Sequence, residues 1–148
     1  YSMMARWYES LFPVLEELKI GFVAFSPLAN GFLSGKYNQN SHFEQGLDYR
    51  SVMPQFKKEN LEKNKELLEL LENLAKDKIA TKGQIALAWM LCKKPYIVPI
   101  PGTRKLDRLK ENIGAAVVEL TASEIQNIDD ALTHMTMSEV FGGTRIEK

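Results

Sequence analysis

Apolar residues recur at helical spacing in several parts of the chain. Leu11, Val14, Leu15 and Leu18 predict an amphipathic helix over about residues 8–19. A leucine-rich pattern predicts a longer helix over about residues 57–77. That pattern does not sustain three heptads, so we expect it to face a core rather than to form a coiled coil.

Two further helices carry start signals in the sequence. Thr81 with Gln84 and Thr121 with Glu124 have the spacing of a capping box, in which the side chains of the first and fourth residues bond each other's backbone N–H groups. We expect one helix to start at Thr81 and to stop before Pro95, which cannot continue a helix. The other is expected to run from Thr121 past Leu132.

Two short apolar runs, Phe22–Phe25 and Tyr96–Ile100, predict strands. Neither run alternates apolar with polar residues, which favours parallel strands buried on both faces. Gly21 is the expected stop of the preceding helix, and Tyr1–Met4 the tail of another strand. Strand–helix alternation indicates a helix-rich α/β fold. Because two parallel strands alone make an unstable sheet, their apolar faces are expected to need neighbours.

The composition describes one ordinary globular domain over residues 1–148, with 45% apolar and 26% charged residues. A formal net charge of zero argues against nucleic acid or a membrane as partner. A single cysteine, Cys92, excludes an internal disulfide and a cysteine-based zinc site, and favours a reducing cytoplasm. We expect that thiol to be buried and inert, and His42 and His134 to lie on the surface. No apolar run approaches the roughly 18 residues of a membrane span, and no signal peptide is evident. Because the sequence starts with Tyr1, we expect it to be part of a longer chain.

An anion site is predicted after the second strand. The turn Pro101-Gly102-Thr103 leads into basic residues, and Thr103 is expected to cap a helix with a buried face of Leu106, Leu109 and Ile113. Backbone N–H groups, the helix dipole and arginine side chains together favour a phosphate. The alternative is an ordinary solvated helix face. Residues 26–56 have no sustained period, and so long a loop is usually functional or disordered.

Five motifs in order give the chain a resemblance to a known family. They are Tyr1-Ser2, Gly21–Leu28, Gly31–Lys36, Gln84–Trp89, and Ile97–Arg104 continuing to Glu111-Asn112. They resemble the C-terminal part of the aldo-keto reductases, which are NADPH-dependent enzymes built on the (β/α)8 barrel. The resemblance weakens over residues 38–56 and after 134. It implies a partial TIM-type barrel: the end of strand 6, then strands 7 and 8 with their helices.

The resemblance also implies a set of NADPH contacts. Phe25 would stack on the nicotinamide ring. The alternative is that Phe25 is an ordinary residue of the hydrophobic core. The pyrophosphate would lie along a set of residues after the first strand: Ser26, Leu28, Gly31, Leu33, Ser34, Gly35 and Lys36. The adenosine end would lie on Ile100, Gly102, Thr103, Arg104 and Arg108, with adenine against Glu111 and Asn112. Arg104 and Arg108 are expected on one helical face, where both could reach the 2′-phosphate that NADH lacks.

The family's catalytic Asp, Tyr, Lys and His would all precede Tyr1, so no catalytic residue and no metal ligand is assigned here. The first interpretation is a cofactor-binding portion of an enzyme that reduces an aldehyde or ketone. The isolated chain is then expected to be inactive. The alternatives are a truncated nucleotide-binding or protein-interaction module, and a scaffold like the channel-regulating barrels of the family. The carbonyl substrate would depend on residues before Tyr1 and on residues 37–56 and 135–148. Self-association, or pairing with a missing N-terminal half, is expected.

Overall fold

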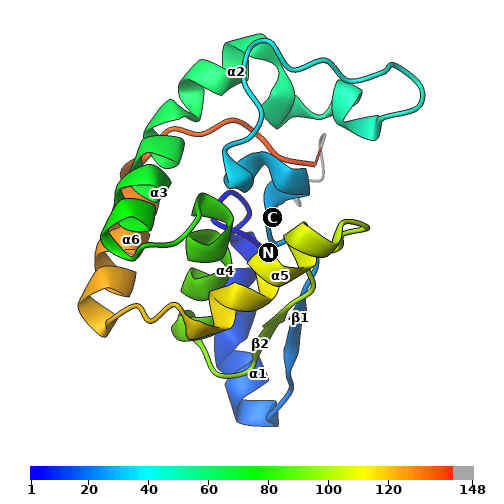
Figure 1. The fold of residues 1–148 in the computed structure, drawn as a ribbon. Helices are drawn as coiled ribbons and strands as arrows, with labels where there is room; N and C mark the ends of the chain where they lie inside the picture. The colour runs from blue at the N-terminus through cyan, green and yellow to red at the C-terminus, as the bar shows by residue number, and fades with distance from the viewer. Residues whose placement is uncertain (142–148) are drawn as a thin grey trace.

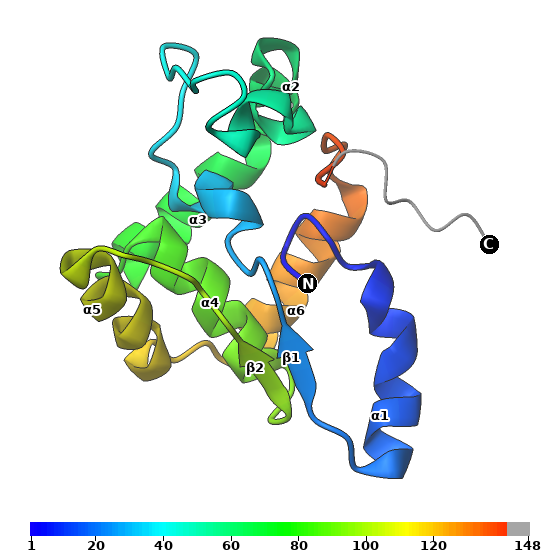
Figure 2. The same ribbon diagram turned by 90° about the vertical axis from the view of Figure 1, so that its right-hand side faces the viewer.

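The computed structural model describes residues 1–141; residues 142–148 of the expected substrate-determining segment lie outside the described part (Figures 1 and 2). The α-helices are α1 (Phe12–Leu18), α2 (Lys58–Lys63), α3 (Lys65–Asp77), α4 (Lys82–Lys93), α5 (Leu106–Gly114) and α6 (Ala122–His134). The strands are β1 (Phe22–Ala24) and β2 (Ile97–Pro99). The 3-10 helices within residues 1–141 are η1 (Trp7–Leu11), η2 (Ala29–Ser34), η3 (Tyr49–Val52), η4 (Pro54–Phe56) and η5 (Ala115–Val117). None of the helices described is long and apolar enough to cross a membrane.

The two strands pair in parallel, with Phe22 opposite Ile97 and Val23 opposite Val98 (Figure 2). Ala24 and Ile97 are buried, and α4 packs against β2. The prediction that both faces are buried is wrong, since Val23 is 62% exposed and Val98 is 54% exposed. Successive strand residues point to opposite sides, and within residues 1–141 only one side of the sheet is covered.

The core gathers around Trp89 of α4, which is fully buried. The ring of Tyr1 stacks on Trp89 at 5.4 Å and meets Phe12 and Phe22 edge-on. The N-terminal segment is therefore part of the core, but the predicted strand tail is wrong. Residues 1–5 instead make a turn closed by a bridge between Ser2 and Ala5, which leaves the Tyr1 amino group to donate to the Phe25 carbonyl at 3.1 Å.

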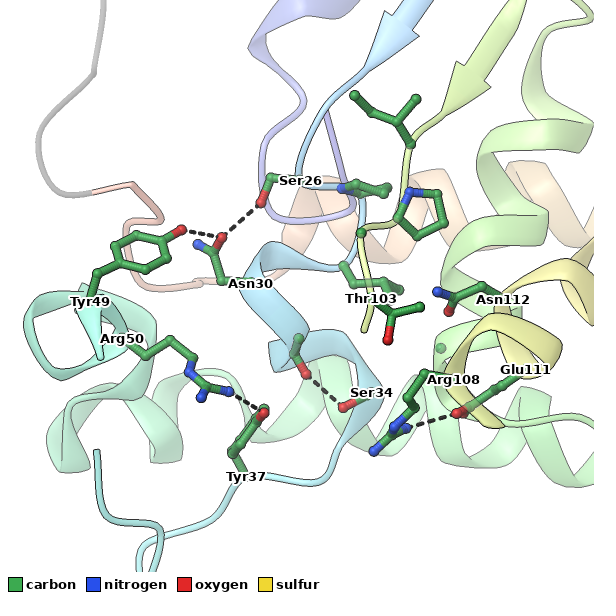
Figure 3. A pocket seen from close by; sticks show the side chains of 17 residues that line it. Ser26, Asn30, Ser34, Tyr37, Tyr49, Arg50, Thr103, Arg108, Glu111 and Asn112 are labelled. Carbon is green, nitrogen blue, oxygen red and sulfur yellow. Dashed lines mark hydrogen bonds and ion pairs between the residues drawn. The ribbon is translucent and has the colours of Figure 1, made fainter. Parts of the chain in front are cut away.

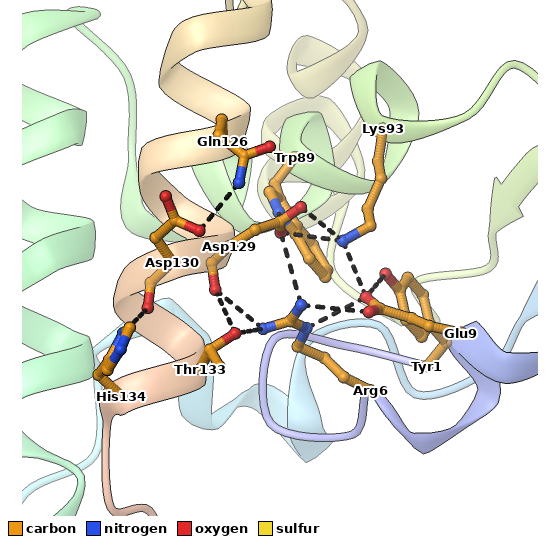
Figure 4. A network of polar contacts seen from close by, with 10 residues as sticks. All are labelled: Tyr1, Arg6, Glu9, Trp89, Lys93, Gln126, Asp129, Asp130, Thr133 and His134. Carbon is orange, nitrogen blue, oxygen red and sulfur yellow. Dashed lines mark hydrogen bonds and ion pairs between the residues drawn. The ribbon is translucent and has the colours of Figure 1, made fainter.

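A polar network joins the N-terminal segment to α4 and α6 (Figure 4). Glu9 accepts from the Tyr1 hydroxyl at 2.6 Å and pairs with Arg6 at 3.1 Å. The Lys93 ammonium lies 2.8 Å from both Glu9 and Asp129, and only 10% of the Lys93 side chain is exposed. The Trp89 indole also donates to Asp129 at 2.9 Å. Each of these partly buried polar groups thus has a hydrogen-bonding or oppositely charged partner.

Both predicted capping boxes are confirmed. Thr81 and Gln84 bond each other's backbone N–H groups at the start of α4, as do Thr121 and Glu124 at the start of α6. A hydrogen bond from Lys78 and the bond to the Thr121 backbone lower the pKa of Glu124 to about 2.

The two other helix predictions need corrections. The first helix is η1 followed by α1, which ends at Leu18. Its C-cap is Lys19, whose φ of 55° is left-handed, so the predicted stop at Gly21 is wrong. Val14 and Leu18 on its apolar side are exposed. The helix predicted over 57–77 is split at Asn64, whose buried amide bonds Ser138 in the C-terminal segment. Its core-facing role is confirmed, because Leu67 and Leu71 are buried.

The helix after the second strand also differs from prediction. α5 begins at Leu106 with Lys105 as its N-cap, and Thr103 instead accepts from the Lys105 N–H at 3.1 Å. Leu106, Leu109 and Ile113 are exposed, because nothing in residues 1–141 packs on that side of the helix. Cys92 is likewise exposed rather than buried. The surface positions of His42 and His134 are confirmed.

Candidate functional site

A cavity of about 510 Å³ lies where the carboxyl ends of β1 and β2 meet (Figure 3). Parallel strands bring their carboxyl ends to one edge, so the turns after the two strands become neighbours although they are distant in sequence. The volume falls within the range of small-molecule sites. Ten of the residues singled out in the sequence line the cavity: Ser26, Leu28, Gly31, Ser34, Ile100, Gly102, Thr103, Arg108, Glu111 and Asn112.

The turn after β1 has an unusual backbone. Ser26, Ala29 and Asn30 all have left-handed φ values, between 48° and 61°. Non-glycine residues adopt this region at some energetic cost, and such strain tends to cluster at binding sites. Asn30 is held from two sides, because its Oδ1 accepts from Ser26 Oγ at 3.1 Å and from the Tyr49 hydroxyl. The turn therefore presents a fixed polar edge to the cavity.

Gly35 ends this turn with a φ of +67°. A Cβ atom built there would lie 2.1 Å from Lys82 Cε, so a larger residue would displace the end of that flexible side chain. The left-handed backbone conformation is the stronger reason for glycine here.

Arg108 and Glu111 form the opposite wall, on one side of α5. Arg108 Nη1 donates to Glu111 Oε2 at 2.7 Å, and both side chains are partly buried. Burial alone would raise the pKa of Glu111, but hydrogen bonds from Thr81 and Arg108 and the charges of Arg108 and Lys36 bring it below its usual value. Gln84 of α4 donates to the Glu111 carbonyl at 3.1 Å, which ties this wall to the core helix.

The sequence model of the aldo/keto reductase family matches residues 1–133. The chain belongs to this family. A probable aldo-keto reductase 1 from Glycine max is 41% identical over 136 residues, which are 91% of this chain and 38% of that protein. The aldo-keto reductase yakc [NADP(+)] from Schizosaccharomyces pombe is 39% identical over 85% of this chain and 36% of its own length. The chain thus spans less than two fifths of these curated relatives.

Solved structures of the aldo-keto reductase family, a TIM-barrel family, have a similar fold. The glycerol dehydrogenase from Gluconobacter oxydans matches with a TM-score of 0.81 at 26% identity, over 99% of this chain and 44% of that one. A thermostable aldo-keto reductase solved with the inhibitor epalrestat matches with a TM-score of 0.60 at 25% identity, over 88% of this chain and 37% of that one. The chain is a helix-rich α/β piece of this aldo-keto reductase fold.

Five residues that the family resemblance singled out do not line the cavity: Phe25, Leu33, Gly35, Lys36 and Arg104. Leu33 is fully buried in the core. Phe25 is half exposed and its ring lies 5.6 Å from that of Phe141. The expectation that Arg104 and Arg108 share a helical face is wrong, because Arg104 precedes the Lys105 N-cap of α5.

Four polar residues of the cavity wall escaped the sequence reasoning: Asn30, Tyr37, Tyr49 and Arg50. Tyr49 and Arg50 come from residues 38–56, where the aldo-keto reductase resemblance weakens and no periodicity guides assignment, and Tyr37 directly precedes that segment. Arg50 pairs with Asp48 and bonds the Tyr37 hydroxyl (Figure 3). A usable signal was Asp48 two residues before Arg50, since Asp readily caps a short helical turn; here it caps η3.

Proposed function

We propose that the chain is the cofactor-binding portion of an NADPH-dependent carbonyl reductase of this family. In this proposal β1 and β2 are the seventh and eighth strands of a (β/α)8 barrel, and the turn over residues 1–5 follows the sixth. One observation carries the proposal: the cavity joins the Ser26–Ser34 turn to the Ile100–Asn112 segment at the carboxyl ends of parallel strands. Active sites of (β/α)8 barrels lie at that end.

The polar side chains that line the cavity can bind the ribose and phosphate groups of NADPH. Ser26, Ser34 and Thr103 offer hydroxyl groups and Asn112 an amide, all of which bind ribose or phosphate oxygens. A Cβ at Gly102 would touch nothing within 4 Å, so a ligand can approach the backbone there. Arg108 would hold the 2′-phosphate, and Glu111, already bonded to Arg108, would orient it.

NADPH, when bound, supplies the hydride that reduces an aldehyde or ketone. A proton donor must also serve the developing alkoxide. In this proposal the family's catalytic Asp, Tyr, Lys and His precede Tyr1; of the two tyrosines on the cavity wall, Tyr49 already donates to Asn30 and Tyr37 accepts from Arg50. We therefore expect the isolated chain to give no carbonyl reduction. Loss of NADPH absorbance with an aldehyde, above a control without protein, would contradict this expectation.

The binding test compares NADPH with NADH by calorimetric titration of the 148-residue chain. We expect weak but selective binding of NADPH, because charge-assisted hydrogen bonds to the 2′-phosphate contribute about 1.5–3 kcal/mol each. Arg108→Ala should weaken NADPH binding and leave NADH binding unchanged. Arg104→Ala should have a smaller effect, because Arg104 lies outside the cavity wall.

Lys63→Ala is the matched control for that titration, because it removes one positive charge from an exposed position on α2. It should leave both titrations unchanged. Equal curves for NADPH and NADH with the unsubstituted chain would refute the assignment of Arg108.

A further inference from the structure

Three aromatic rings from separate segments meet at the carboxyl end of β1. The Phe141 ring lies 5.6 Å from that of Phe25 at an angle of 33°, and 6.4 Å from that of Trp7 at 90°. Both separations are within the range in which aromatic rings attract each other. Phe141 therefore joins the C-terminal segment both to the turn after β1 and to the N-terminal segment.

The Phe25 ring lies at the edge of the cavity. Ala24 is opposite Pro99 in the pairing of the strands, so the same register places Phe25 beside Ile100, which lines the cavity. Phe25 is still 52% exposed, although the Phe141 ring packs against it. Part of the Phe25 ring is therefore supported by the protein, and part is open to a ligand.

The C-terminal segment is anchored at the break between α2 and α3. It follows α6 and is drawn in orange-red in Figure 1. The buried side chain of Asn64 donates to Ser138 Oγ at 2.8 Å and accepts from the Ser138 N–H at 2.9 Å. Val140 is buried in the core. These contacts fix the residues that immediately precede Phe141.

Phe141 also has a left-handed backbone, with a φ of 67°. Bulky residues rarely adopt this region, and its energetic cost persists only where surrounding contacts determine the conformation. Here those contacts are the anchor at Ser138 and the rings of Phe25 and Trp7. The contacts around Phe141 therefore specify where its ring lies.

We propose that Phe141 is a positioning residue that supports the Phe25 ring from one side. The bonds between Asn64 and Ser138 hold Phe141 in that place. The open part of the Phe25 ring then receives a flat ring of the ligand. NADPH has two such rings, and its adenosine end is assigned to the Arg108 wall, so the ring at Phe25 is the nicotinamide. This inference rests on the proposed function, because it concerns the same ligand.

The test compares NADPH with adenosine 2′,5′-bisphosphate, which has the same adenosine end and no nicotinamide. Calorimetric titration of the 148-residue chain measures both ligands. Phe141→Ala should weaken NADPH binding about three- to tenfold, as expected for the loss of one aromatic contact, and should leave the bisphosphate within about twofold.

Three further variants separate positioning from a general loss of structure. Phe141→Tyr keeps the ring and should bind NADPH like the unsubstituted chain. Asn64→Ala removes the anchor, so it should weaken NADPH as Phe141→Ala does and speed deuterium exchange at the Ser138 amide. Leu18→Ala removes an exposed apolar side chain from α1 and should change neither titration. The thermal midpoint of each variant reports its folding, and the Phe141 variants carry the test if Asn64→Ala does not fold.

The outcomes distinguish this inference from the proposed function. NADPH binding that is unchanged in Phe141→Ala, or weakened equally with the bisphosphate, would overturn the role of Phe141 alone. Tighter NADPH binding by that variant would also overturn it, because Phe141 would then occupy the place of the ligand ring. Binding of neither ligand by the unsubstituted, folded chain would overturn the proposed function as well.

Discussion

At the scale of single residues, the charged side chains of this chain act through local hydrogen bonds and ion pairs, because the formal net charge is zero. Glu9 shows this best, because it meets the Tyr1 hydroxyl, Arg6 and Lys93 at once. Burial would raise the pKa of Glu9, but the hydrogen bonds from Arg6, Lys93 and Tyr1 together lower it. The charged form of Glu9 therefore stabilises the fold.

This depressed pKa predicts how stability depends on pH. A carboxylate with a lowered folded-state pKa contributes stability above its unfolded value, near 4.5, and that contribution disappears as the pH falls through the folded value. Glu9→Gln should lower the free energy of unfolding at pH 7 by about 1–3 kcal/mol and flatten the loss of stability below pH 4.5. Urea unfolding at a series of pH values measures both effects. The exposed Glu17→Gln serves as control, and parallel pH curves for Glu9→Gln and the unsubstituted chain would contradict the prediction.

At the scale of elements, the sequence predicts what local interactions determine. The capping boxes at Thr81 and Thr121 need only residues three apart, and both form as predicted. Whether Val23 or Leu106 is buried depends on which other elements pack against its strand or helix, and a local sequence pattern does not contain that information. Both residues were predicted to be buried, and both are exposed. The end of α1 depends on the left-handed backbone conformation of its C-cap, Lys19. The break between α2 and α3 at Asn64 involves a hydrogen bond to Ser138, which is distant in the sequence.

The residues of the candidate site likewise fall into those that local sequence motifs could predict and those that they could not. Residues within contiguous motifs, such as Ser26, Thr103 and Arg108, could be assigned from the sequence and do line one cavity. Tyr37 and Arg50 could not, because they reach the cavity through the irregular segment 37–56, whose path follows from packing. The pairing of Arg104 with Arg108 failed because it assumed a helix start two residues too early.

At the scale of the whole molecule, the main feature is a half-covered sheet. Val23, Phe25, Val98 and Ile100 are each more than half exposed, and Val23 lies opposite Val98 in the pairing of β1 with β2. The sheet has two strands in the part of the chain that the structure describes, so each strand has an outer edge. Unpaired strand edges and exposed apolar patches both favour pairing with another chain.

We therefore expect the free chain to associate through this sheet, as a dimer or larger assembly, with a complementary N-terminal half, or as an aggregate. Size-exclusion chromatography with light scattering measures this directly. Val98→Lys places a charge in the middle of the exposed face and should shift the chain towards monomer, because a buried unpaired ammonium is costly. Val117→Lys adds the same charge at an exposed position on η5, outside the sheet, and should change nothing. A monodisperse monomer of the 16.8 kDa chain that melts cooperatively would show that one covered face is enough for a stable fold. The partial-barrel proposal would then lose its structural basis.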